Sequence, residues 1–292
     1  MALEKLSPCK VNLVLNILGR RADGFHELET LMHPVAVCDR LAVERQASGV
    51  KLTCSNHTLP ADSRNLVHRA ATAFLEAAKI PDGVRIRLEK NIPLAAGLGG
   101  GSGDAATTLM ALNELFDQPL AAERLNALAA ALGSDVPFFL QNQPALATGR
   151  GEKIQSLESF SVLNGKAFFL VHPGFGIATA WAYQNLARFP TALNGQPGRA
   201  AKLVSSLRAG DIRALAGGLF NSLEAPALEK FPVLGLFQEF FRENGALGTL
   251  MSGSGSTTFA IVESVKAGEA LLEPFKSKFG GNCWTAVVPV QK

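Results

Sequence analysis

The sequence predicts an α+β fold in two domains. Runs with the period of a β-strand and runs with the period of a helix are mixed along the chain without a strict β-α-β alternation, which favours α+β over a doubly wound parallel sheet. The 292 residues, 47% of them hydrophobic, suit one large domain or two of ordinary size. A loop-like stretch at 152–165 is the expected boundary, so we expect domains over residues 1–155 and 156–292.

The N-terminal elements alternate between strand and helix patterns. In KVNLVLNILG, Val11, Leu13, Leu15 and Ile17 share one face, as in a half-buried strand. The turn GRRADGFHE and a second strand-like run, HPVAVCDRLAVE, follow. After Arg64, NLVHRAATAFLEAA has its apolar residues spaced for one helical face, and VRIRLEKNIP alternates again as a strand.

The rest of the chain mixes the same two patterns. Residues 105–116 repeat at helical spacing, with Ser102 or Asp104 as the expected cap, and LAAERLNALAAALG is a helix stopped by Gly133. The later expected elements are a strand in AFFLVHPG, helices in GRAAKLVSSLRAG and FPVLGLFQEFFREN, strand–turn–strand in LGTLMSGSGSTTFAIV, a helix in VKAGEALLEPFKSKFG kinked or broken at Pro274, and a strand in CWTAVVPV.

Composition argues against several classes of protein. A net charge of +3, without any Lys/Arg-rich run, does not indicate nucleic-acid binding. No apolar run is long enough to span a bilayer, and MALEKLSPCK lacks a signal-peptide core. No cysteine pair has C-x-x-C spacing, so we expect neither a zinc knuckle nor a thioredoxin-type redox motif. Four scattered thiols in a chain this long fit a reducing compartment; they are Cys9, Cys38, Cys54 and Cys283. We therefore expect a cytoplasmic protein with no nucleic-acid or membrane partner.

The histidines do not have the spacing of a metal site. They show no H-E-x-x-H or similar pattern, so we expect no metal held by the protein itself; they are His26, His33, His57, His68 and His172.

The most informative stretch is PLAAGLGGGSGDAA, of which we call residues 93–103 the glycine segment. It lies between an expected strand and an expected helix, where glycines allow positive φ and close backbone approach, and bare N–H groups at a helix start favour an anion. It has no P-loop lysine and is too dense in glycine for a dinucleotide motif. Phosphate binding is the favoured interpretation, and a tight packing turn is the alternative.

Three motifs in order carry a family resemblance. They are SPCKVNLVLNILGRRADGFHELET, the glycine segment, and LMSGSGSTTFAIV. Together they resemble the galactokinase, homoserine kinase, mevalonate kinase and phosphomevalonate kinase family, over residues 6–259. The first motif combined with LGSDVPFFL resembles the branch whose acceptor substrate carries a cytidine diphosphate group.

This resemblance implies a two-domain small-molecule kinase with an N-terminal nucleotide-binding and catalytic domain and a C-terminal α/β-sandwich domain for the substrate. The implied reaction is ATP-dependent phosphorylation of the 2-hydroxyl of a cytidine-diphosphate-linked methylerythritol, which gives the 2-phosphate and ADP in the non-mevalonate isoprenoid pathway. Mg²⁺ would arrive with ATP, and the protein would be a monomer or weak homodimer. The alternatives are a homoserine- or mevalonate-type kinase and a non-catalytic nucleotide-binding protein.

By motif match, the catalytic residues are Asp135 in GSDVPFF and Lys10 in SPCKVN. A carboxylate can accept the proton of an alcohol during phosphoryl transfer. A nearby ammonium keeps that carboxylate ionised and offsets charge on the transferring group. Without the motif match, the common alternatives would be favoured: Asp135 as a helix cap before Val136 and Pro137, and Lys10 as a solvated strand residue.

The resemblance also implies an ATP site. Asn65 and Leu66 match the segment beside adenine, and their alternative is a helix N-cap with a core leucine. The residues implied at the ATP phosphates are Pro93, Leu94, Ala95, Ala96, Gly97, Leu98, Gly99, Gly100, Gly101, Ser102 and Gly103. The family usually has serine at the position of Gly103, so a hydroxyl is missing there.

The implied substrate-binding residues are Asn12, Phe25, His26, Thr179 and Tyr183. His26 matches the residue that hydrogen-bonds cytosine, which suits a neutral imidazole with one donor and one acceptor. Phe25 replaces the family's usual tyrosine and keeps only the ring.

Two features of the substrate end stay open at this point. Tyr183 matches the aromatic residue that stacks on the base, and Trp181 is its rival. The glycine–serine stretch 252–256, here called the third motif, either forms a plain hairpin turn or closes over the substrate or supports the glycine segment.

Overall fold

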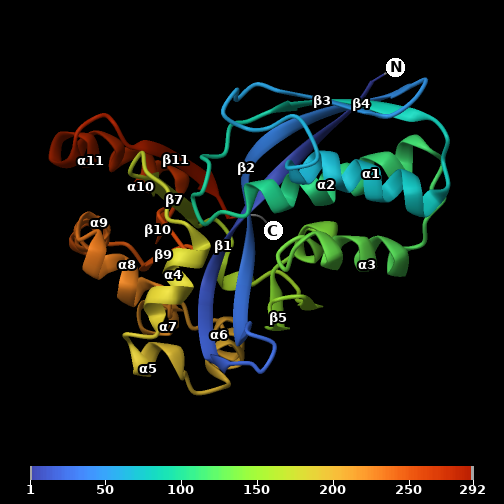
Figure 1. Cartoon of the computed structure of the whole chain (residues 1–292). Coiled ribbons are helices and arrows are strands. Elements are labelled where there is room, and N and C mark those ends of the chain that lie inside the picture. Colours follow the sequence, from blue (N-terminus) through green and yellow to red (C-terminus); the bar gives the residue numbers. More distant parts are fainter. Residues whose placement is uncertain (1, 291–292) are drawn as a thin grey trace. The chain divides into compact units, whose positions relative to one another are not determined.

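The computed structural model describes residues 2–290, which form two compact units. Figure 1 labels their elements. Unit 1 comprises Met1–Cys9, Val37–Ile92 and Gly99–Asn142, and unit 2 comprises Lys10–Ala36, Pro93–Leu98 and Gln143–Lys292. The units are therefore not consecutive stretches of chain. The expected division near residue 155 stays a prediction about which residues serve the nucleotide and which serve the substrate.

Unit 1 contains a sheet built around β4 (Gly83–Glu89). This strand pairs antiparallel with the end of β2 (His26–Gln46) and parallel with β3 (Val50–Cys54). Along β4, Val84, Ile86 and Leu88 are buried and the intervening residues are exposed, as its alternation predicts. The short β3 was not expected.

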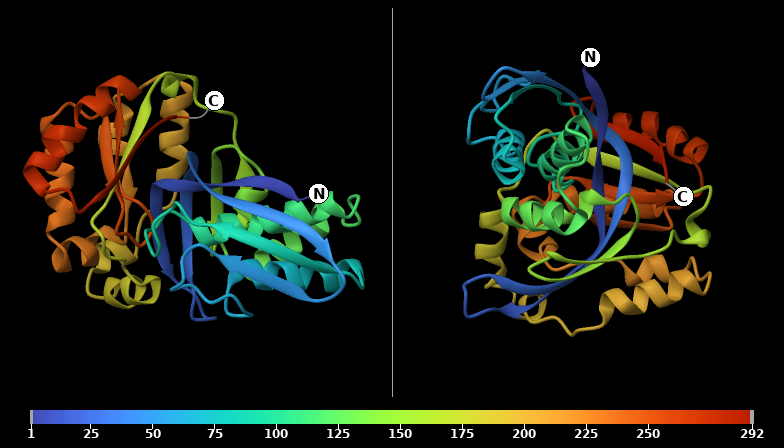
Figure 2. Two further views of the ribbon diagram at one scale, coloured as in Figure 1. Left: turned by 90° about the horizontal axis from the view of Figure 1, so that it is seen from above. Right: turned by 90° about the vertical axis from the view of Figure 1, so that its right-hand side faces the viewer.

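The helices of unit 1 are α1 (Leu66–Ala78), α2 (Gly100–Leu115) and α3 (Ala122–Leu132), followed by the short 3-10 helix η1 (Pro137–Leu140). The first two pack side by side, as Figures 1 and 2 show. All three α-helices were expected, and Gly133 follows the last one as the sequence predicts. Phe74 on α1 is fully buried, because the apolar stripe of this helix faces the interior.

Unit 2 takes up most of β1 (Leu3–Arg20) and the start of β2. It adds three short strands, which are β5 (Ala145–Gly149), β6 (Lys153–Ser156) and β8 (Phe220–Asn221). The expectation of a half-buried first strand is wrong, because both faces of β1 are covered and every residue from 9 to 17 is buried. Lys10, Asn12 and Asn16 are among them, so this strand places polar groups in the interior.

A second sheet in unit 2 has the antiparallel order β11-β7-β10-β9. Its strands are β7 (Ala167–His172), β9 (Gly248–Met251), β10 (Thr258–Val262) and β11 (Trp284–Pro289). The expected strand–turn–strand is the β9–β10 hairpin, and the third motif is its turn.

Unit 2 also contains helices, some of which pack against this sheet. Their bounds are α4 (Thr179–Leu186), α5 (Pro190–Leu193), α6 (Arg199–Arg208), α7 (Ala214–Gly218), α8 (Glu224–Lys230), α9 (Val233–Glu243), α10 (Val265–Ala270) and α11 (Leu272–Phe279), with the 3-10 helix η2 at Ser161–Leu163. The expected break near Pro274 is confirmed, because α10 ends at Ala270 and Pro274 lies in the first turn of α11. Phe169, Phe241 and Phe275 join helices to sheet in a buried aromatic cluster.

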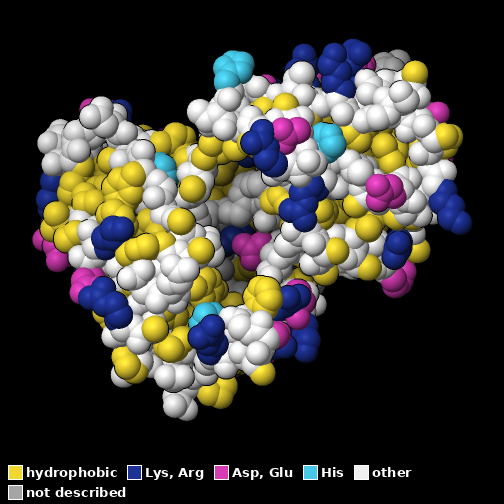
Figure 3. Space-filling model, in the orientation of Figure 1, with side chains coloured by type: hydrophobic (Ala, Val, Ile, Leu, Met, Phe, Trp, Pro, Cys, Tyr) yellow, Lys and Arg dark blue, Asp and Glu magenta, His cyan; other side chains and the backbone are white. Residues whose placement is uncertain are grey.

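The surface agrees with the balanced composition of 28 basic and 25 acidic residues. On the face that Figure 3 shows, lysine and arginine side chains are scattered among acidic ones in each unit. Among the described residues, no helix is long and apolar enough to cross a membrane.

Candidate active site

The first part of the glycine segment, residues 93–98, is held in unit 2 by its own carbonyl groups. The Gly97 carbonyl accepts hydrogen bonds from Ser252 Oγ at 2.9 Å and from Lys10 Nζ at 3.2 Å. The Ala96 carbonyl accepts one from the Thr257 N–H at 3.1 Å, and the Leu98 carbonyl one from the Lys10 N–H at 2.9 Å. The third motif thus supports the glycine segment, which was one of the three alternatives for it.

Gly97 is required as glycine at this contact. Its φ is 75°, in the left-handed region, and a Cβ there would lie 2.0 Å from the Ser252 carbonyl oxygen and 2.9 Å from the Gly255 nitrogen. Both neighbouring atoms belong to the backbone and cannot turn aside. Any larger residue at 97 would separate the glycine segment from the third motif.

The second part of the glycine segment, residues 99–103, begins helix α2 in unit 1. The N-cap residue is Gly99, with a φ of 71° and no side-chain cap bond. The expected capping by Ser102 or Asp104 is wrong, because the helix starts at Gly100 and both side chains lie inside it. The first N–H groups of a helix lack partners within the helix, and the dipole of a helix this long favours negative charge at that end.

Gly103, where the sequence departs from its family, is fixed by packing. A Cβ at this position would lie 2.6 Å from the Pro8 carbonyl oxygen and 3.1 Å from Ser7 Oγ. Helix α2 therefore passes the N-terminal strand too closely for a serine. The missing hydroxyl reflects this close approach.

We expect Gly103→Ser to lower the free energy of unfolding by about 1–3 kcal/mol, the usual cost of overpacking a buried site. Thermal unfolding of the purified variant measures this. Gly101→Ser is the matched control, because a Cβ on Gly101 would meet only Leu66 Cδ1, at 3.8 Å. An unchanged Tm for Gly103→Ser together with higher activity would contradict the packing explanation.

Asn65 is the N-cap of α1. Its Oδ1 accepts the Val67 N–H at 2.9 Å and its Nδ2 donates to the Pro60 carbonyl at 2.8 Å. The cap interpretation of Asn65 is therefore confirmed, whereas Leu66 is only half-buried and so is not a core leucine. Its Cδ1 stands beside Gly101, which brings the predicted adenine segment to the predicted phosphate segment within unit 1.

Lys10 and Asn12 form a buried polar pair on β1. Lys10 is 3% exposed, and its Nζ donates to Asn12 Oδ1 at 2.5 Å. Asn12 Nδ2 donates to Thr30 Oγ1 at 2.8 Å, and the Asn12 N–H reaches Ser252 Oγ at 3.4 Å. The alternative that Lys10 is a solvated strand residue is wrong, because its ammonium lies in the interior of unit 2.

Asp135 belongs to unit 1, so the structure places it in a different unit from Lys10. It lies in the turn before η1, and the N-cap residue of η1 is Val136, with no side-chain cap bond. The cap interpretation of Asp135 therefore finds no support. Its catalytic role stays a prediction.

The expected cytidine residues His26 and Tyr183 meet within unit 2. Their ring centroids are 4.9 Å apart and the rings are tilted by 34°. Burial, with a further contribution from the charge of Arg20, lowers the pKa of His26, so the imidazole is neutral at neutral pH. Trp181 instead packs near Phe231, with its ring 4.3 Å from Lys230 Nζ.

Phe25 and Thr179 lie nearer the surface of unit 2. Phe25 is 52% exposed, and the Arg150 guanidinium stacks 4.7 Å from its ring centroid. Thr179 Oγ1 and Ser254 Oγ share a hydrogen bond of 3.1 Å, so a predicted substrate residue contacts the third motif. The structure thus brings together Thr179 with the third motif, and His26 with Tyr183.

Sequence reasoning missed two residues that hold the third motif and the end of β9. Asn221 Nδ2 donates to the carbonyls of Met251 and Gly253, both at 2.8 Å, on either side of Ser252. Glu224 accepts the Met251 N–H at 2.7 Å, and burial raises the pKa of its carboxyl to about 7. Both residues fix backbone atoms of a distant segment, a contact for which the sequence carries no local signal.

The described residues include no group of three or more His, Cys, Asp or Glu side chains arranged to hold a metal ion. Residues 65–143 match the N-terminal domain model of the GHMP kinases, and residues 203–281 match their C-terminal model.

Two curated relatives are similar along most of their length, and both are 4-diphosphocytidyl-2-C-methyl-D-erythritol kinases. The one from Syntrophotalea carbinolica is 40% identical over 290 residues, which cover 98% of this chain and 98% of the relative. The one from Synechococcus sp. is 41% identical over 271 residues, which cover 91% of this chain and 86% of the relative.

Two solved structures are similar to this chain over nearly its whole length. A crystal structure of 4-(cytidine 5'-diphospho)-2C-methyl-D-erythritol kinase has a TM-score of 0.78 and 37% identity, covering 98% of this chain and 99% of that one. A homoserine kinase from Cytophaga hutchinsonii has the same TM-score of 0.78 at 21% identity, covering 99% of this chain and 96% of that one. The second likeness concerns the fold alone.

Proposed function

This chain belongs to the 4-diphosphocytidyl-2-C-methyl-D-erythritol kinases of the GHMP kinase family, and we propose that it transfers the γ-phosphoryl group of ATP to the 2-hydroxyl of that substrate. The observation that carries the proposal is 40% identity over nearly the full length of both chains. The predicted α+β two-domain kinase fold is confirmed by the structural match. The products are the 2-phosphate and ADP, and Mg²⁺ arrives with ATP.

Asp135 is the base in this proposal and Lys10 its electrostatic partner. An alcohol is a weak nucleophile at neutral pH, so a carboxylate that accepts its proton during transfer lowers the barrier. The ammonium of Lys10 is buried, so water screens its charge little. It can therefore offset the negative charge that the transferring group carries. Asn12, bonded to that ammonium, limits the positions that it can adopt.

In this proposal, recognition of the cytidine group depends on the two rings in contact, His26 and Tyr183. A neutral His26 offers one donor and one acceptor to a pyrimidine edge, and its contact with Tyr183 provides an aromatic surface for the base. Phe25 contributes a ring and Thr179 a hydroxyl. Apart from Asn12, Phe25 and His26, which serve the substrate, we assign residues 1–155 to nucleotide binding and catalysis, and we assign residues 156–292 to the substrate. We also propose a cytoplasmic monomer or weak homodimer.

The purified protein should release ADP from ATP and Mg²⁺ with 4-diphosphocytidyl-2-C-methyl-D-erythritol, and not with homoserine or mevalonate.

Asp135→Asn should lower kcat about 10²-fold or more, because it removes the base, and should leave ATP-analogue affinity within a few-fold. Asp82→Asn, at an exposed position of unit 1, is the control. Turnover of another alcohol at an equal rate supports the rival kinases, and an unchanged kcat for Asp135→Asn excludes the base role.

The glycine segment holds the ATP phosphates in this proposal. Its carbonyls at 96, 97 and 98 are already bonded, so its polar capacity toward a ligand is in the N–H groups. The Gly103 N–H is bonded to the Gly99 carbonyl at 2.9 Å, which leaves the N–H groups before it for phosphate oxygens. Gly101 is exposed, so its backbone is open to a ligand.

Gly101→Ala tests this assignment, because only a ligand would collide with the added methyl group. The site accepts a Cβ at ordinary contact distance, 3.8 Å from Leu66 Cδ1, and alanine favours the helix. We expect an unchanged or higher Tm and a KM for ATP raised roughly tenfold, about 1.4 kcal/mol of lost binding. Gly235→Ala in α9, with no atom within 4 Å of its Cβ, is the matched control. Normal ATP affinity in Gly101→Ala would refute the phosphate assignment.

A further inference from the structure

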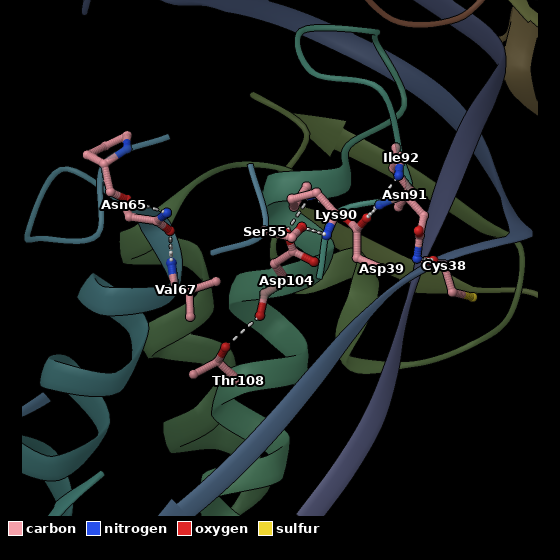
Figure 4. A network of polar contacts seen from close by, with 11 residues as sticks. Cys38, Asp39, Ser55, Asn65, Val67, Lys90, Asn91, Ile92, Asp104 and Thr108 are labelled. Atoms are coloured by element: carbon pink, nitrogen blue, oxygen red, sulfur yellow. Dashed lines mark hydrogen bonds and ion pairs between the residues drawn. The ribbon is translucent and has the colours of Figure 1, made fainter. Parts of the chain in front are cut away.

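A buried ion-pair network lies at both ends of the glycine segment, within unit 1 (Figure 4). Lys90 Nζ donates to Asp104 Oδ2 at 2.6 Å and also to Asp39 Oδ2. Asp104 directly follows Gly103, and Lys90 lies three residues before Pro93. One ammonium therefore connects the chain before the segment to the chain after it.

Asp39 also fixes the backbone just before the glycine segment. Its Oδ1 accepts the N–H of Asn91 at 2.6 Å and the N–H of Ile92 at 2.9 Å, the last residues before Pro93. The Lys90 N–H donates to Ser55 Oγ at 2.9 Å, so the lysine itself is fixed to its surroundings (Figure 4). The backbone entering the glycine segment is thus held at three successive residues.

Burying three charged side chains costs desolvation free energy, so a contribution to fold stability alone does not explain this network. The side chains of Lys90, Asp39 and Asp104 are 5%, 0% and 2% exposed, and two carboxylates face one ammonium. Burial raises the pKa of Asp104 to about 7, against the lowering effect of Lys90. Buried ion pairs of this kind are often no more stabilising than apolar residues of equal size, and their advantage is a defined geometry.

Defined geometry is what a glycine-rich segment lacks. Glycine has the widest backbone freedom, so a segment dense in glycine loses more entropy than others when it is ordered around a ligand. Fixing both ends of a loop removes part of that freedom before the ligand binds. The first N–H groups of α2 then start from a constrained position.

We propose that Lys90 is a positioning residue for the ATP phosphates, which fixes the two ends of the glycine segment by bridging Asp39 and Asp104. The inference rests on the proposed function, in which this segment binds those phosphates. Lys90 acts through the backbone and not by contact with ATP. The network therefore serves the phosphate part of the nucleotide and not the adenosine part.

The test compares two ligands, a non-hydrolysable ATP analogue with Mg²⁺ and adenosine, by calorimetry on the full chain. We expect Lys90→Met and Asp104→Asn each to weaken the analogue roughly tenfold and to leave adenosine affinity within about twofold. Asp104→Asn keeps the size of the side chain and adds no unpaired charge, so it decides the matter if Lys90→Met does not fold. Arg85→Met, which breaks only an exposed ion pair with Glu44, is the control.

Equal weakening of both ligands would overturn the inference, because it would show a general structural effect. So would unchanged analogue affinity in both variants while Gly101→Ala still weakens the analogue. If Gly101→Ala has no effect either, the phosphate assignment itself fails, and the two failures are thereby told apart.

Discussion

The Gly97 carbonyl is the point at which three distant sequence motifs meet in unit 2. It accepts hydrogen bonds from the ammonium of Lys10 and from the hydroxyl of Ser252. The same ammonium reaches Asn12, and the Asn12 N–H in turn reaches Ser252 Oγ at 3.4 Å, which closes a ring of polar contacts. Lys10, Asn12 and Ser252 are almost fully buried, so removal of one member leaves the others without water to replace it.

This ring explains features that look unrelated in the sequence. Position 97 must be glycine because the Ser252 carbonyl approaches within 2.0 Å of where a Cβ would be. The third motif must be held still, and the amide of Asn221 does so from both sides of Ser252. The lysine that this glycine segment lacks, compared with a P-loop, is thus present nearby as Lys10. It bonds a carbonyl of the segment, and in the proposed reaction it also serves the acceptor.

The local sequence pattern was sufficient to predict a strand or helix of which only one face is buried. The alternation in β4 and the apolar stripe of α1 were both predicted, since each has one exposed side. The pattern was misleading for β1, because side chains on both of its faces are buried, the polar ones together with the apolar ones. The cap of α2 was also missed, since a left-handed glycine serves where a side chain was expected.

Only those site residues that lie in recognisable motifs could be predicted from the sequence. Motif resemblance singled out Lys10, the glycine segment, His26 and Tyr183, whose roles stay predictions, and the structure adds that the last two rings are in contact. Spacing gave no sign of the Lys90 network, because Asp39 and Lys90 are 51 residues apart and only the fold joins them. The packing at Gly103 depends likewise on the Pro8 carbonyl, a backbone atom whose position no side-chain pattern encodes.

The ring at Gly97 is tested most directly by the kinetics of Ser252→Ala. Loss of a buried hydroxyl that serves two backbone groups costs about 1–3 kcal/mol of folding stability. It also releases the Gly97 carbonyl from the third motif, so we expect kcat/KM for ATP to fall roughly tenfold, about 1.4 kcal/mol. Ser264→Ala is the matched control, because it removes the side-chain cap of α10 and should lower stability without changing kcat/KM. A Ser252→Ala protein that loses stability as this control does, yet keeps its full kcat/KM, would contradict the account.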